Sequence, residues 1–330
     1  MFMNPTRREF LAKSAALAAA GAWSLPRLLA DDDNPPVKAR VIIARDEALT
    51  RGEVDEHRDL LRKLLDAAMQ KLTGAADAGA AYRKLFKPSE RIGIKVNTLG
   101  FTVRPAVVDA LVAGLRAADI PAENIIIWDR FDKELVKAGF TLNKTGQGVQ
   151  CRGTDAERIG SGYQEKVETS GQIGSCYSKI LAEDIDALIC VPVLKDHSIA
   201  GVTLTMKSFY GAIHNPNKYH DQHCDPYIVD VVSHPLVRNK LRLSVCDAVR
   251  GQCQGGPGVK REYVWPYGGL LAATDYVALD AVGADIIEAQ RRELGLKPVA
   301  EDGRPFRYIA TAAERGLGIA DLNRIERAAV

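Results

Sequence analysis

The chain has 330 residues, of which 46% are hydrophobic and 26% charged, and its formal net charge is +2 at pH 7. The first 30 residues hold four basic and one acidic side chain, a net charge of +3, so the remainder carries about −1. The remainder therefore lacks the basic excess that favours nucleic-acid binding. No apolar run after residue 30 reaches the length of a membrane-spanning helix, so no integral membrane span is expected there.

The N-terminus predicts an export signal. Arg7 and Arg8 precede an apolar, alanine-rich run that is too short to span a bilayer stably. This order is typical of signals read by the twin-arginine export machinery, which delivers folded proteins to the periplasm or otherwise outside the cytoplasm. The alternative is a frayed helix with two surface arginines. We expect a signal peptide over 1–30, a linker over 31–38 and a single α/β domain over 39–330.

Strand and helix patterns alternate in the first half of the chain. Strands are expected at 40–44, 91–97 and 124–128, and helices at 53–86, interrupted near 74–79, and at 106–118 after Pro105. Strand, helix, strand in that order is a βαβ unit, which favours a parallel sheet.

The second half continues the alternation after a glycine-rich loop at 142–174. Strands are expected at 185–192, 241–246 and 270–274, and helices at 226–233, at 276–291 and over most of 306–329. A doubly wound, mostly parallel α/β sheet with helices on both faces accounts for this order best.

Lys195 and His197 directly follow the strand expected at 185–192. Ligands of open α/β sheets bind at the carboxyl ends of strands. Lys195 suits an anion, and His197 suits an acid–base group or a metal ligand. The alternative is a solvated loop with ordinary charges.

Further polar groups extend this candidate site. Lys207, with hydroxyl side chains around it, suits a carboxylate or phosphate, unless the segment 201–213 is an exposed amphipathic helix. Asp247 follows a strand and is a candidate acid, base or ligand. The glycine-rich loop after it either brings backbone N–H groups to an anion or is a flexible turn. Anion-binding residues are thus expected at Lys95, Asn97, Gly255 and Gly256, and catalytic residues at Lys195, His197, Lys207 and Asp247.

The histidines and cysteines suggest metal binding. Five of the six histidines lie between 197 and 234, and four potential ligands follow one another in a loop: His214, His220, His223 and Cys224. Imidazole and thiolate suit a transition metal, although this spacing is not a standard zinc pattern. The alternative is a polar surface loop. No tight cysteine run exists, so a ferredoxin-type iron–sulfur cluster is not expected. Disulfides are compatible with export, but their pairing cannot be read from the sequence.

Several segments together resemble the family catalogued as domain of unknown function 362. The matching segments are Lys95-Val-Asn97, 104–111, Val191-Pro-Val-Leu-Lys-Asp-His197, 202–211, Asp247 with Gly255-Gly-Pro257, and Asp275 with Asp280. The resemblance covers most of 38–290. It implies that Lys95, Asn97, Lys195, His197, Lys207 and Asp247 matter, but it implies no activity because the family has no settled one. Many of its members carry ferredoxin-type cysteine runs, which this chain lacks.

These observations lead to three hypotheses. The first is an exported enzyme that acts on a small anionic substrate, with metal-assisted or redox chemistry. The second is an exported protein that binds a metal or small ligand without turnover. In the third, the cysteines form disulfides and the histidines are incidental.

Overall fold

A sheet of 11 strands lies at the centre of the computed structural model, which describes residues 38–155 and 161–330. Lys38–Val330 form one compact unit. The predicted export signal and most of the predicted linker lie outside the described residues. No helix within the described ranges is both long and apolar enough to cross a bilayer.

The main path of the sheet is parallel except around one strand. Its order is β13 (Ile325–Ala329), β1 (Ala39–Arg45), β12 (Gly269–Ala273), β10 (Leu241–Gln252), β7 (Ala187–Val191), β2 (Ile92–Val96), β3 (Ile125–Asp129) and β4 (Gln150–Gly153). Only β12 runs antiparallel to its neighbours on this path. Three short strands extend the sheet: β8 (Val193–His197), β9 (Gly201–Val202) and β11 (Val264–Trp265). A separate hairpin pairs β5 (Glu168–Ser170) with β6 (Ile173–Ser175).

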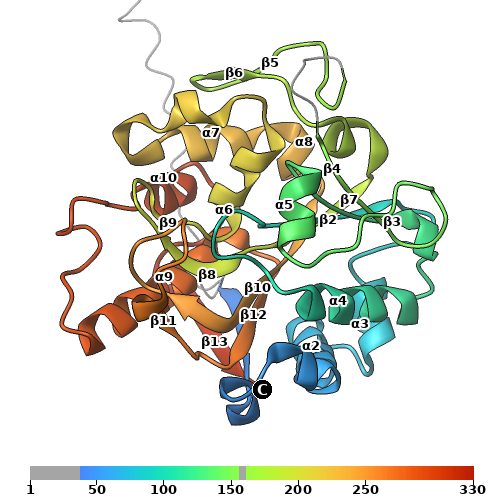
Figure 1. Ribbon diagram of the computed structural model, residues 1–330, viewed down its shortest axis with the longest axis horizontal. Helices are drawn as coiled ribbons and strands as arrows, with labels where there is room; N and C mark the ends of the chain where they lie inside the picture. The colour runs from blue at the N-terminus through green and yellow to red at the C-terminus, as the bar shows by residue number, and fades with distance from the viewer. Residues whose placement is uncertain (1–37, 156–160) are drawn as a thin grey trace, which may run out of the picture. The chain divides into compact units, whose positions relative to one another are not determined.

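Helices cover both faces of the sheet, as Figure 1 shows. One face packs against α2 (Arg58–Thr73), α3 (Ala78–Arg83) and α4 (Pro105–Ala117). The other packs against α6 (Leu204–Ser208), α7 (Tyr227–Ser233), α9 (Tyr276–Glu293) and α10 (Tyr308–Glu314). Strand β7 shows why two cores form: Leu188 and Cys190 point into one, and Ile189 points into the other. The predicted α/β class, with its mostly parallel sheet, is confirmed.

Shorter helices connect these elements. They are η1 (Glu47–Thr50), η2 (Val54–His57), η3 (Ala122–Asn124), α5 (Asp132–Lys137), η4 (Ile180–Asp184), η5 (Phe209–Ala212), η6 (Pro216–Tyr219), η7 (Asp221–Cys224), α8 (Pro235–Arg238), η8 (Arg261–Tyr263) and η9 (Leu322–Arg324).

One expectation and two alternatives about local structure are wrong. The C-terminus is not mostly helical, because β13 pairs in parallel with β1. Residues 195–197 do not form a solvated loop: they belong to the buried strand β8. Residues 204–208 are all buried in α6, so the exposed amphipathic helix is excluded as well.

Candidate functional site

A cavity of about 480 Å³ opens where β2, β3 and β8 end. The carboxyl ends of parallel strands meet at one edge of a sheet, and that edge is the usual ligand site of this fold class. Six of the residues expected from the sequence line the cavity: Lys95, Asn97, Lys195, His197, Lys207 and His220. Four further lining residues that we had not singled out also bear on its chemistry: Asp129, Arg130, Glu134 and Tyr210.

Lys95 and Asp129 form a buried ion pair at the ends of β2 and β3. Lys95 Nζ lies 2.6 Å from Asp129 Oδ1, and the two residues are 1% and 5% exposed. The other carboxylate oxygen, Oδ2, accepts hydrogen bonds from the backbone N–H and the hydroxyl of Thr98. Asp129 thus compensates one lysine charge and holds the loop that follows β2.

Lys195 is fully buried and donates to three oxygens. Its Nζ lies 2.9 Å from Asn97 Oδ1, 2.6 Å from the carbonyl of Leu99 and 2.7 Å from that of Phe101. Burial lowers the pKa of Lys195 to about 7, with additional repulsion from Lys207. Three acceptors use all three N–H bonds of an ammonium group. Lys195 therefore fixes the 97–101 loop through these three hydrogen bonds, and its ammonium group has no N–H left to donate to a ligand.

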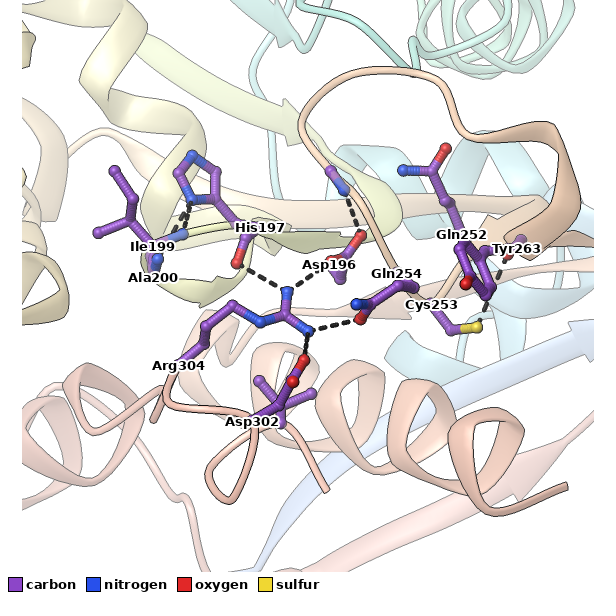
Figure 2. Close-up of polar contacts among 12 residues, drawn as sticks. Asp196, His197, Ile199, Ala200, Gln252, Cys253, Gln254, Tyr263, Asp302 and Arg304 are labelled. Atoms are coloured by element: carbon purple, nitrogen blue, oxygen red, sulfur yellow. Dashed lines mark hydrogen bonds and ion pairs between the residues drawn. The ribbon is translucent and has the colours of Figure 1, made fainter. Parts of the chain in front are cut away.

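His197 is held as a neutral ring with a defined tautomer. Its Nδ1 accepts hydrogen bonds from the backbone N–H groups of Ile199 and Ala200, each at 3.1 Å, as Figure 2 shows. The ring proton must then sit on Nε2, which makes His197 a hydrogen-bond donor. Burial, with repulsion from Lys207, lowers the pKa of His197 to about 2. Of the two roles expected for His197, this arrangement disfavours that of a general base.

Arg304 supports His197 from a segment outside the strands. Its Nη1 lies 2.7 Å from Asp196 Oδ2 and 3.2 Å from the His197 carbonyl oxygen (Figure 2). Its Nη2 bonds to Gln254 and Asp302. Because Asp196 is completely buried, Arg304 compensates a charge that has no access to water.

Lys207 lies against two rings at the cavity wall. Its Nζ lies 3.8 Å from the centre of the Tyr210 ring and 3.3 Å from His220 Nε2. His220 Nδ1 faces the Asn217 carbonyl oxygen, so Nδ1 donates there and Nε2 accepts from the lysine. Among the described residues, His220 is the one hydrogen-bond partner of Lys207 Nζ, which leaves two N–H bonds for a ligand. Burial lowers the pKa of Lys207 to about 8.

The cavity has a net positive charge. Within the described ranges its lining includes four basic side chains, of Lys95, Arg130, Lys195 and Lys207, against the carboxyl groups of Asp129 and Glu134. Burial raises the pKa of Glu134, and the nearby Asp129 carboxylate adds to the effect, which favours the neutral acid. The cavity thus attracts anions.

Asp247 does not line the cavity, so we drop its assignment as a catalytic residue. Its buried carboxylate accepts from Arg104 Nη1 at 2.9 Å, from the backbone N–H of Arg104 and from that of Val249. Asp247 therefore neutralises Arg104 and fixes the start of α4.

Gly255 and Gly256 also lie outside the cavity lining, so the prediction that they bind an anion is corrected. The N–H of Gly256 donates to Asp196 Oδ1 at 2.7 Å. A Cβ on Gly256 would lie 2.1 Å from the Asp196 carbonyl oxygen. The glycine is required for this close approach of two backbone segments, which places the neighbouring Pro257 at the cavity.

The four-residue metal site is also corrected. No three His, Cys, Asp or Glu side chains in 38–155 and 161–330 gather in a way that could hold a metal ion. Gln222, His223 and Cys224 have φ values of 51°, 56° and 66°, so this loop passes through three consecutive left-handed residues. His223 faces the carbonyl of Ile199, Cys224 is buried, and His214 packs against Tyr163.

All six cysteines are free and buried, which argues against the disulfide hypothesis. Burial raises the pKa of Cys151 to about 11 and also raises that of Cys224. Neither thiol is therefore poised as a thiolate near neutral pH.

The functional residues that sequence reasoning missed are of two kinds. Asp129 ends β3 and Arg130 follows it, next to the strand that carries Lys95, and this position was a usable signal. No sequence signal connects Arg304 with Asp196, because 108 residues separate them.

Comparisons with known proteins assign the chain to a family but do not indicate which activity it has. No curated protein matches the chain. A crystal structure of a structural-genomics target protein from Thermotoga maritima matches at 11% identity, with a TM-score of 0.39 over 73% of this chain. The match spans 59% of the length of that protein. The family described as Domain of unknown function (DUF362) matches residues 85–285, more than half of the chain. The chain therefore belongs to the DUF362 family.

Proposed function

We propose that this protein is an enzyme that binds a small anionic substrate in the cavity and uses Lys207 to transfer a proton. The anion is a carboxylate or a phosphate group, which Lys207 and the Nε2–H of His197 contact directly. Lys95 and Lys195 contribute charge, but their own hydrogen bonds fix them in supporting positions.

The observation that carries the proposal is the environment of Lys207. A buried ammonium group with one hydrogen-bond partner is costly unless a further acceptor is available to it. An anion in the cavity would supply that acceptor. A pKa of about 8 lets a lysine exchange its proton near neutral pH, as general acid–base catalysis requires.

Binding can be tested with inorganic phosphate and acetate as probes, by NMR titration at pH 7. Lys207→Met keeps most of the side-chain volume and removes the charge, so we expect it to weaken binding about tenfold or more. Lys218→Met is the matched control, because Lys218 also lies over a tyrosine ring, that of Tyr219, but is exposed and outside the cavity. Equal affinities of both variants for both probes would refute the proposal.

Turnover is tested separately. A small-molecule extract of the host cells is incubated with the wild-type protein or with Lys207→Met, and its carboxylates and phosphate esters are followed by mass spectrometry. We expect a component that only the wild-type protein consumes. Binding without any such change would favour the second hypothesis, a protein that binds a small ligand without turnover.

We further propose that residues 1–30 direct export through the twin-arginine route. The order of Arg7, Arg8 and the apolar run supports this. Arg7→Lys with Arg8→Lys should retain the protein in the cytoplasm, whereas the control Arg27→Lys should be exported normally. Export of the double variant at the wild-type level would contradict the proposal.

A further inference from the structure

We infer that the substrate is an amphiphilic acid, with an anionic head group at Lys207 and an apolar body against a wall made by Leu99, Ile199 and Pro257. This inference rests on the proposed function and narrows its substrate class. The three residues come from three loops and all line the cavity. We refer to them as the apolar wall.

The size of the cavity first indicates a larger ligand than an inorganic ion. A volume of about 480 Å³ lies in the range of pockets that enclose drug-sized organic molecules. One carboxylate or phosphate group fills a small part of it. The rest of the ligand must match the side chains farther from the lysines.

The wall exposes large apolar side chains to solvent. Leu99 is 53% exposed and Ile199 is 38% exposed, although both lie beside buried cationic and polar groups. A scattered exposed leucine needs no explanation, but two large apolar side chains at one cavity are a feature of ligand sites. In Figure 2, Ile199 lies close to the His197 ring.

Backbone hydrogen bonds hold the apolar wall in place. Its side chains are therefore exposed although the loops that carry them are fixed. Lys195 Nζ donates a hydrogen bond to the carbonyl oxygen of Leu99, and the Phe101 N–H donates to the carbonyl oxygen of Pro257 at 3.0 Å. A Cβ on Gly100, whose φ is +69°, would lie 1.9 Å from that same carbonyl oxygen. Only glycine allows the two loops to meet this closely.

The backbone of Ile199 is fixed at both ends. Its N–H donates to His197 Nδ1, and its carbonyl oxygen faces His223 Nδ1 at 3.3 Å. The N–H of the preceding Ser198 donates to the Gly256 carbonyl at 2.8 Å. The hydrogen bond from the Ile199 N–H to His197 Nδ1 therefore has two effects. It helps to set the His197 tautomer, which contacts the anionic head group, and it positions Ile199, which contacts the apolar body.

The test is an NMR titration of the purified protein at pH 7 with acetate, butyrate and hexanoate. Full burial of one methylene gives about a fourfold gain in affinity, and the wall covers one side of the chain, so we expect about twofold per methylene. Leu99→Ser and Ile199→Ser should each weaken hexanoate binding about threefold or more, and should weaken it more than they weaken acetate binding. Leu294→Ser is the control, because Leu294 is 48% exposed and lies outside the cavity lining.

The outcomes separate the two proposals. Affinity that rises with chain length and depends on Leu99 and Ile199 supports the inference. If acetate and hexanoate bind equally well and both need Lys207, the apolar wall has no role and the inference is overturned, while the proposed anion site stands. If neither the carboxylates nor inorganic phosphate binds, the proposed function fails and the inference fails with it.

Discussion

Replacing Arg304 by glutamine tests the arrangement behind His197 most directly. Arg304 Nη1 lies 2.7 Å from Asp196 Oδ2, and the side chains are 11% and 0% exposed. The substitution leaves the buried Asp196 carboxylate without a counter-charge, with the Gly256 N–H still donating to it. Removing one partner of a buried ion pair costs about 3–5 kcal/mol. We expect the free energy of unfolding to fall by that amount.

The control is an ion pair of similar length on the surface. Arg327 Nη1 lies 2.8 Å from Asp285 Oδ2, but both side chains are 35% exposed. Arg327→Gln should cost less than about 1 kcal/mol, because water solvates the carboxylate that remains. Urea unfolding followed by tryptophan fluorescence measures both losses. Adding Asp196→Asn to Arg304→Gln should restore part of the stability. Equal losses for the two arginine variants would refute the argument that burial decides the cost.

Three further predictions concern the site. Gly256→Ala should destabilise the protein by about 1–3 kcal/mol in urea unfolding, because its Cβ would meet the Asp196 backbone at 2.1 Å; Gly258→Ala, whose nearest neighbour is 4.0 Å away, should be nearly neutral, and similar losses would contradict this. In nitrogen-15 NMR, His197 should keep its proton on Nε2 and stay neutral down to about pH 4, since its pKa is lowered to about 2; a titration between pH 5 and 7 would show that the ring is not held as described. Acetate affinity should fall by up to tenfold per pH unit above about pH 8, as Lys207 loses its proton, and Lys207→Arg should abolish the part of the fall that lies above pH 8; an affinity that does not change above pH 8 would exclude the lysine as the anion contact.

The parallel sheet was predictable because most of its strands can be recognised from their own residues. Buried parallel strands consist of near-continuous β-branched and apolar runs. Strand β7 and the first four residues of β3 have that pattern, and β2 has it except at Gly93 and Lys95. Strand β13 does not. Its sequence, Ile-Glu-Arg-Ala-Ala, is rich in helix-forming residues, and four of its five residues are not buried. Pairing with β1 overrides the local preference, and no local pattern reports such pairing.

The sequence predicted correctly most of the candidate-site residues that lie at the ends of strands. It did not predict how residues in the loops are placed. Lys95, Lys195 and His197 meet because parallel strands align their carboxyl ends. The proposed metal loop failed because its residues have separate surroundings: His214 packs against Tyr163, His223 faces the Ile199 carbonyl and Cys224 is buried. Spacing in sequence does not contain that information. A glycine motif after a strand has the same limitation: Gly256 serves a backbone contact instead of a ligand.

The position of β1 in the sheet has a consequence for biosynthesis. Ile42 pairs with Ala272 on one side and with Ala328 on the other, so both neighbours of β1 are made long after it. Translation proceeds from the N-terminus, so an apolar, β-prone strand waits without a partner until residues 269–273 and 325–329 have left the ribosome. Unpaired strand edges of this kind recruit other chains. We expect the nascent protein to need a holding chaperone over residues 39–45, and β1 to pair on both sides only after residues 325–329 have left the ribosome.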